Sequence, residues 1–309
     1  MAGPARRRAR LRHDGRSGGR PGARLVARAP RGQPAWRGRT ARRAADGTEG
    51  AVRRRGDLVG RFVVRRPGDR ADGGPVLTFD VDDAGVVVVA LDRPDRLNTV
   101  TVALRDALIE AFLAVRDLPH ARAMVLRANG RHFSAGADLT EFGSADSVFE
   151  ARRIRWDRDP WGPLWDLPVP VVVALHGYSL AAGLEMALLC DVRLAAPDTV
   201  VGLPETKLGM LPAAGGTQSL TKVVGPAAAL PIVATARNLD AAEALRVGIV
   251  HAVVDDVESA ALDVARRWAA CDPAALRAAK RALRSAGDLP LDAGLVVEAR
   301  LARAMLRRD

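Results

Sequence analysis

HGYSLAAGLEMA (residues 176–187) joins a predicted strand to a predicted helix, and this junction decides the fold. The run Val171–Leu175 before it is continuously apolar, as expected of a strand buried on both faces. A helix is expected from Leu180 to Cys190, and the first N–H groups of a helix have no internal partners. Small residues at its start leave those donors uncovered. The junction therefore predicts a site that can hold developing negative charge on an oxygen atom.

Two glutamates are the candidate acid–base residues. Glu185 is the only charged residue in the stretch 171–190, although a glutamate in the first turn of a helix is also favoured by the helix dipole. Glu205 follows Pro204, which biases the residue before it toward an extended conformation. We expect Glu205 to lie on a constrained loop after a strand. The alternative for Glu205 is a solvated side chain near Lys207.

Two further segments are rich in small residues. RHFSAGADL (residues 131–139) follows a short predicted strand and has Gly136 at its centre. Small side chains let a ligand approach the backbone closely, but a tight turn has the same composition. The segment Gly215-Gly216-Thr217 opens a later helix and indicates a close packing point.

The rest of the ordered chain alternates predicted strands and helices. The helix at 101–118 presents an apolar face at helical spacing, formed by Leu104, Leu108, Ala111, Phe112 and Val115. Repeated strand-then-helix units predict an α/β fold with a helical C-terminal part. Further strands are expected at 76–81, 86–91, 123–126, 192–195, 199–202 and 249–254, and further helices at 147–166, 215–224, 226–234, 241–247, 257–270, 273–285 and 291–306.

Charge divides the chain into two unequal parts. Residues 1–75 hold 21 Arg, no Lys and 6 acidic residues, a net charge of +15, whereas residues 76–309 carry a net charge of −4. The first segment has too few regularly spaced apolar residues to offset its chain entropy, so we expect 1–75 to be a disordered, Arg-rich extension. It has three explanations: an organellar transit peptide, a nucleic-acid-binding arm, or translated upstream DNA from a wrongly assigned start.

Several classes of protein and site are not expected. Two cysteines are too few for a disulfide framework, and Cys190 is interpreted as a small core residue. No apolar run is long enough for a membrane span, so a cytoplasmic location is expected. No spacing of His, Cys and carboxylate residues predicts a metal site, and no GxxxxGK motif is present. His132 and His176 flank the motifs and are interpreted as structural.

Together, these segments resemble the enoyl-CoA hydratase/isomerase (crotonase) superfamily. LDRPDRLN (residues 91–98) is similar to the opening motif of that family, and the resemblance covers roughly Val76 to Ser285. It implies a spiral of repeated ββα units over 76–255, followed by a helical trimerisation part over 256–309. We expect that part to be shorter than in the family. The resemblance also implies a homo-trimer or a dimer of trimers.

The resemblance implies roles for individual residues. The backbone N–H groups of Ala137 and Ala182 would form an oxyanion hole, while Glu185 activates a water molecule and Glu205 delivers a proton. Trp156, Trp161 and Trp165 are interpreted as packing residues, with the lining of an acyl pocket as the alternative. Contacts to CoA would fall on Asn98, Thr99, Ala135, Asp138, Leu139 and Thr140, with Lys280 as a candidate for a CoA phosphate.

The expected activity is hydration of a 2-enoyl-CoA to the 3-hydroxyacyl-CoA. CoA belongs to the substrate, and no further cofactor is implied. An enoyl-CoA isomerase or another CoA lyase or hydratase of the same family is the nearest alternative. The presence of both glutamates favours hydration, because an isomerase can work with one. Nucleic-acid binding through the Arg-rich arm is an alternative of a different class, and it is not the expected partner.

Overall fold

The computed structural model describes residues 60–64, 74–143, 146–147, 150 and 157–307 of the 309-residue chain. The predictions for residues 1–59 lie outside the described residues. So do Trp156 and most of the first half of the helix predicted at 147–166.

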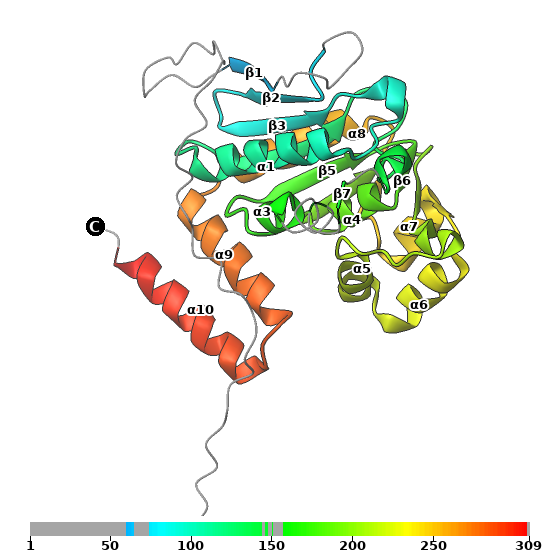
Figure 1. Cartoon of the computed structure of the whole chain (residues 1–309). Coiled ribbons are helices and arrows are strands. Elements are labelled where there is room, and N and C mark those ends of the chain that lie inside the picture. Colours follow the sequence, from blue (N-terminus) through cyan, green and yellow to red (C-terminus); the bar gives the residue numbers. More distant parts are fainter. Residues whose placement is uncertain (1–59, 65–73, 144–145, 148–149, 151–156, 308–309) are drawn as a thin grey trace, which may run out of the picture. The chain divides into compact units, whose positions relative to one another are not determined.

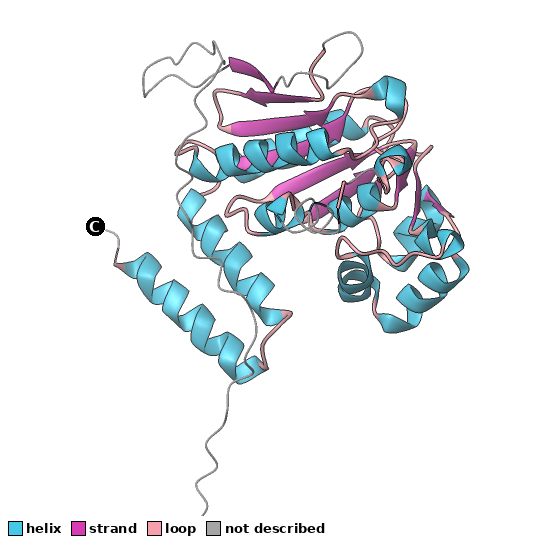
Figure 2. Ribbon diagram, in the orientation of Figure 1, coloured by secondary structure: helices cyan, strands magenta, loops and turns pink. Residues whose placement is uncertain are grey.

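Within the described part of the chain, seven strands form a central sheet in the order β1-β2-β3-β4-β5-β7-β10 (Figures 1 and 2). The first three strands pair antiparallel, and every later pairing in this sheet is parallel. The strands are β1 (Gly60–Val64), β2 (Leu77–Val81), β3 (Val86–Leu91), β4 (Ala123–Ala128), β5 (Val171–Leu175), β7 (Val192–Ala195) and β10 (Ala252–Val253).

Strand β1 corrects the prediction that order begins near Val76. It lies inside the segment predicted to be disordered, and it pairs with β2 from Gly60 opposite Val81 to Val64 opposite Leu77. Three of its five residues are Phe or Val, which favour strands. The edge of β2 offers unpaired backbone groups to such a segment. The Arg-rich composition around β1 hid this short strand.

A smaller sheet and a set of helices complete the α/β fold, as predicted. β6 (Tyr178–Leu180) pairs parallel with β8 (Val200–Gly202), which pairs antiparallel with β9 (Leu239–Asp240). Among the described residues, the 3-10 helices are η1 (Pro94–Arg96), η2 (Leu139–Glu141) and η3 (Pro204–Leu208). The α-helices are α1 (Val102–Asp117), α3 (Trp161–Trp165), α4 (Ala182–Leu188), α5 (Gly216–Val224), α6 (Pro226–Thr235), α7 (Ala241–Val247), α8 (Val257–Ala269), α9 (Pro273–Ala286) and α10 (Leu291–Leu306).

The central sheet is covered on both faces, which explains the continuous apolar run of β5. Val172 and Ala174 belong to a cluster that includes Ala261 and Ala265 of α8. The alternate positions of β5 belong to the larger core, together with the apolar face of α1. In Figure 1, α1 and α8 lie on opposite sides of the sheet. Successive strand residues point to opposite faces, so a strand covered on both must be apolar at every position.

The α1 helix begins and ends close to the predicted residues. The Thr101 hydroxyl accepts a hydrogen bond from the Leu104 N–H at 3.2 Å, which caps the helix. The predicted apolar face is buried, and α1 therefore has a fixed orientation on the sheet. Its less buried side carries Arg105, which faces the candidate site described below. No helix in the described ranges is both long and apolar enough to cross a membrane.

Candidate active site

Two loops of small residues, 131–139 and 176–183, are hydrogen bonded to each other. The Ser134 N–H donates to the Tyr178 carbonyl, and the Leu180 N–H donates to the Ser134 carbonyl, both at 2.9 Å. Gly136 has φ of +103°, and a β-carbon on it would lie 2.7 Å from Cβ of Ala181. Any larger residue would push the loops apart, so the close approach explains the glycine.

This junction places two unpaired backbone donors in one cavity. Gly136 and Asp138 on either side of Ala137 hydrogen bond to Val100, but the N–H of Ala137 has no acceptor among the described residues. Ala182 is the first residue of α4, and its N–H also has no acceptor in that part of the chain. Both residues line a cavity of about 390 Å³. The structure therefore brings together the two N–H groups that the sequence predicted to act together.

The residue before α4 has a strained backbone. Ala181 has φ of 49° and ψ of −126°, a conformation that L residues other than glycine rarely adopt. Its N–H donates to the Gly202 carbonyl at 2.9 Å, which holds the loop against the second sheet. Such conformations cost on the order of 1–3 kcal/mol and persist where the surrounding structure enforces them. Here the strain turns the chain so that α4 begins with its N–H groups at the cavity.

Glu185 lies in the first turn of α4 and is 3% exposed. Its Oε1 accepts hydrogen bonds from the N–H groups of Ala214 and Gly216, both at 2.9 Å. A β-carbon at Gly216 would lie 2.7 Å from this oxygen, which confirms the predicted packing point. Burial is the main cause that raises the pKa of Glu185 to about 7, opposed by these two hydrogen bonds.

Glu205 lines the same cavity as Glu185 but comes from a different segment, η3. β8 ends at Gly202, and Pro204 opens η3, so Glu205 lies on a constrained loop as predicted. Glu205 is 8% exposed whereas Lys207 is exposed, which rules out the solvated alternative. Burial raises the pKa of Glu205, and its Oε2 is buried with no hydrogen-bond partner among the described residues. The charge of Glu205 also raises the pKa of Glu185, so ionisation of Glu205 favours the protonated form of Glu185.

Comparison with known proteins gives this geometry a family. The sequence profile of the enoyl-CoA hydratase/isomerase family matches residues 82–309. The chain belongs to this family. It is 36% identical over 221 residues to a probable enoyl-CoA hydratase, echA8, of Mycobacterium bovis, covering 71% of this chain and 85% of that protein. It is 37% identical over 218 residues to the 2,3-dehydroadipyl-CoA hydratase of Escherichia coli, covering 70% and 85%.

Solved structures show the same mixed α/β crotonase fold with two sheets and C-terminal helices. The enoyl-CoA hydratase of Bacillus anthracis superposes with a TM-score of 0.72 at 31% identity, covering 76% of this chain and 92% of that one. An enoyl-CoA hydratase from Geobacillus kaustophilus gives a TM-score of 0.70 at 33% identity, covering 75% and 90%. The protein is therefore an enzyme of the enoyl-CoA hydratase family, and this family acts in acyl-CoA metabolism.

The other residues implied by the crotonase resemblance fall into two groups. Ala135 and Leu139 line the cavity with the glutamates. Asp138, Thr99 and Thr140 instead form a hydrogen-bonded cluster beside it, in which Asp138 accepts from both threonine hydroxyls. Thr140 is the main cause that lowers the pKa of Asp138. The cluster holds the loop that carries Ala137.

Asn98 lies in the interior of the enzyme. Its side-chain oxygen accepts from the Arg93 N–H at 2.7 Å, and its amide donates to the carbonyls of Asn129 at 2.9 Å and His132 at 2.8 Å. The residue is fully buried, so its side chain secures the loops and does not line the cavity. The structure gives no support to a direct contact between this side chain and CoA.

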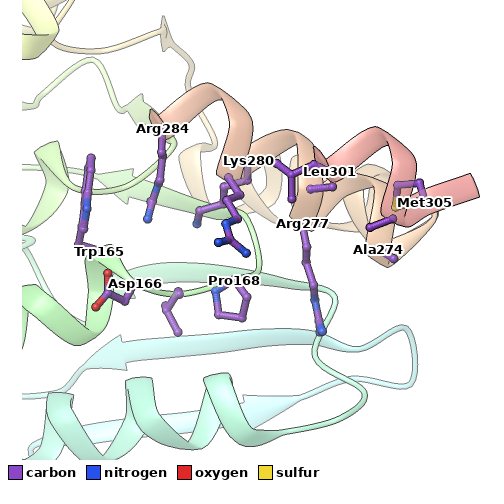
Figure 3. Close-up of a pocket in the computed structure, with 13 residues that line it drawn as sticks. Trp165, Asp166, Pro168, Ala274, Arg277, Lys280, Arg284, Leu301 and Met305 are labelled. Carbon is purple, nitrogen blue, oxygen red and sulfur yellow. The ribbon is translucent and has the colours of Figure 1, made fainter. Parts of the chain in front are cut away.

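Lys280 is not brought to the cavity that holds Glu185 and Glu205. It lines a separate cavity of about 620 Å³ between α9, α10 and residues 165–168 (Figure 3). Its ammonium donates to the Val169 carbonyl and to Asp191, both at 2.6 Å, and the residue is 8% exposed. Lys280 is therefore held in a buried ion pair, and its surroundings give no support to the expected phosphate contact. An amphipathic α9 carries the lysine, and its spacing alone did not show which way this face points.

Arg105 is the cavity residue that sequence reasoning missed. It lies on α1 and lines the cavity, and its charge acts to lower the pKa of Glu185. On the sequence it belongs to the polar side of an amphipathic helix, where most charged residues are solvated. Its proximity to Glu185 depends on the packing of α1 against the sheet, which helical spacing does not reveal.

Proposed function

We propose that the enzyme adds water across the 2,3 double bond of 2-enoyl-CoA thioesters. One observation carries the proposal: two buried carboxyl groups, Glu185 and Glu205, share a cavity with the backbone donors of Ala137 and Ala182. The names of the relatives reported above, including hydratases of enoyl-CoA and 2,3-dehydroadipyl-CoA, support the reaction class.

The first task of the site is to make the substrate electrophilic. The thioester oxygen accepts hydrogen bonds from the N–H groups of Ala137 and Ala182, which draws electrons from C3 and stabilises the enolate. One such preorganised donor contributes on the order of 3 kcal/mol to the transition state. These donors need no reorganisation when charge develops, because the strained turn at Ala181 and the paired loops already fix them.

The glutamates divide the two proton transfers. Ionised Glu185 takes a proton from a water molecule, whose oxygen bonds to C3. Protonated Glu205 then delivers its proton to C2 of the enolate, which gives the 3-hydroxyacyl-CoA. One carboxyl group of the pair has to be ionised while the other holds a proton, and the pKa of about 7 for Glu185 keeps a proton in the cavity near neutral pH. The division of roles between the two glutamates follows the family resemblance.

The experiment follows the loss of conjugated-enoyl absorbance when the enzyme is mixed with crotonyl-CoA. Glu185→Gln and Glu205→Gln are each expected to lower kcat by about 10²–10⁴-fold. Glu110→Gln, a change of the same type at an exposed position on α1, serves as the matched control and retains activity.

A second substrate separates hydration from the family alternative. If crotonyl-CoA and longer 2-enoyl-CoA esters bind without turnover while a 3-enoyl-CoA is converted to its 2-enoyl isomer, the enzyme is an isomerase and the proposal is wrong. Full activity in either glutamine variant would also contradict it, because the mechanism assigns each glutamate a proton transfer.

We also propose self-association through the C-terminal helices into the trimer or dimer of trimers that the family resemblance implies. Large apolar side chains on α9 and α10 are exposed in the single chain, including Leu283 at 75% and Leu291 at 80%. A soluble monomer rarely exposes such a group of side chains on neighbouring helices. Light scattering coupled to size exclusion measures the mass directly, and a monomer at micromolar concentration would refute self-association.

A further inference from the structure

A second cavity, of about 330 Å³, adjoins the cavity that holds the two glutamates. The two share three wall residues, Arg105, Ala213 and Ala214. Beyond them, the second cavity is lined by aromatic and apolar side chains that include Trp161 and Trp165. Because the two cavities share three wall residues, the second cavity continues the cavity that holds the glutamates.

Two residues that line the second cavity, Arg105 and Trp161, carry hydrogen-bond donors. Arg105 reaches it from α1, and the Arg158 carbonyl accepts from the guanidinium at 3.5 Å. Arg105 also lies 5.7 Å from the ring centroid of Trp161. Trp161 is only 5% exposed, and its buried indole N–H has no acceptor among the described residues. Buried polar groups are nearly always hydrogen bonded, so this donor indicates a ligand acceptor.

The orientation of the substrate follows from the proposed function. With the thioester oxygen at the N–H groups of Ala137 and Ala182 and C2–C3 at the glutamates, the acyl chain beyond C3 has to leave the first cavity. The shared wall at Arg105 leads it into the second. We propose, on the basis of that function, that the enzyme selects acyl chains with a distal carboxylate, which Arg105 and Trp161 bind.

Desolvation explains why a carboxylate is favoured over a methyl end. An acyl chain that fills the cavity removes water from the Arg105 guanidinium, while the buried indole N–H of Trp161 already lacks an acceptor among the described residues. A methyl end does not replace the lost hydrogen bonds, whereas a carboxylate accepts from both donors and supplies the opposite charge. Arg105 is therefore a specificity residue as well as a neighbour of Glu185.

Other charged groups near the second cavity set the strength of this preference. Asp159 lines it and opposes a carboxylate, although its Oδ1 already accepts from the Trp161 backbone N–H at 3.1 Å. Arg158 is paired with Asp106 at 3.4 Å. Replacing Asp159 with asparagine removes the repulsion while an amide oxygen can still accept that hydrogen bond. The variant Asp159→Asn is therefore expected to raise the preference for a carboxylate.

The test compares trans-2-hexenoyl-CoA with the six-carbon 2-enoyl-CoA that carries a terminal carboxylate. The measured quantity is the ratio of their kcat/KM values, in which effects on the shared chemistry cancel. The enzyme is expected to favour the carboxylate substrate. Arg105→Met should reduce the ratio by at least about tenfold, Trp161→Phe by about threefold, and Arg105→Lys should restore part of the loss. Arg116→Met, on the exposed side of α1, serves as control and leaves the ratio unchanged.

Binding distinguishes failure of this inference from failure of the proposed function. If the enzyme hydrates neither substrate, calorimetric titration with hexanoyl-CoA and its terminal-carboxylate counterpart still tests the cavity, and preference for the latter must depend on Arg105. Equal affinity for both ligands would overturn the inference. So would hydration of both substrates at a ratio that Arg105→Met leaves unchanged, and that result would leave the proposed hydration intact.

Discussion

Replacing Glu185 with glutamine is expected to stabilise the folded enzyme at alkaline pH while it abolishes turnover. The amide oxygen of glutamine can keep the hydrogen bonds from Ala214 and Gly216, which Oε1 of Glu185 accepts at 2.9 Å. The substitution thus removes a buried charge and conserves side-chain shape.

The magnitude follows from the pKa of Glu185. Its rise from 4.5 to about 7 corresponds to roughly 3 kcal/mol, at about 1.4 kcal/mol for each pH unit. Between these two values the folded state binds the proton and the unfolded state releases it. The free energy of unfolding of the native enzyme therefore falls as the pH rises from 4.5 through 7. The glutamine variant lacks this loss, so it gains about 3 kcal/mol over the native enzyme at pH 8 and almost nothing at pH 4.5.

Thermal unfolding at a series of pH values measures the difference. For a chain of this size, about 3 kcal/mol corresponds to a rise in Tm of roughly 6–10 °C at pH 8. Asp83→Asn, at an exposed position in the turn between β2 and β3, is the control for general effects of removing a negative charge. One result would refute this reasoning: a Tm for Glu185→Gln that is unchanged or lowered at pH 8 and differs from the native Tm by an amount that does not depend on pH. It would mean that ionising the buried Glu185 does not cost stability.

Three further substitutions test the packing around the site. Ala181→Gly should raise stability by about 1 kcal/mol in urea unfolding, because relief of the strain at φ 49° exceeds the entropic cost of glycine; a loss of stability would contradict the strain. Gly216→Ala should cost about 1–3 kcal/mol and lower kcat, because its β-carbon would lie 2.7 Å from Oε1 of Glu185; unchanged kinetics would show that this contact relaxes freely. Asp191→Asn should lower the free energy of unfolding by about 3–5 kcal/mol near pH 6, because the charged, buried Lys280 loses its partner. The loss should be smaller at pH 9, since burial lowers the pKa of Lys280 to about 8; a loss that does not depend on pH would argue against the ion pair.

The helices and strands that could be predicted from the sequence are those with a simple pattern of apolar residues or a clear boundary residue. β5 and α10 were predicted to the residue, because one is apolar at every position and the other begins directly after Pro290. The short strands β6 and β9 were missed, because two or three residues are too few to show a period. The helix expected from Leu180 begins instead at Ala182, since the preceding residues extend the chain into the second sheet.

The candidate site shows a similar division. Local chain direction places the N–H groups of a helix start, so Ala182 and Glu185 could be predicted from one junction. Arg105 and Lys280 could not be placed, because their surroundings come from elements far apart in the sequence. Arg105 meets the site through the packing of α1, and Lys280 is held by Asp191, 89 residues away. Amphipathic spacing indicates which face of a helix is polar, but it does not tell what lies opposite that face.

The unfavourable features of the structure are concentrated around the proposed reaction. The strained turn at Ala181, the buried carboxyl groups of Glu185 and Glu205, and the unpaired N–H of Ala137 all border one cavity. Each reduces stability in the free enzyme, and the carboxyl groups and the N–H of Ala137 gain hydrogen-bond partners when a thioester and a water molecule enter. If this account holds, a bound acyl-CoA must relieve these costs together. The stabilising effect of Glu185→Gln should then shrink in the presence of the ligand, because a bound water molecule solvates the native carboxylate and offsets part of the cost of burying its charge.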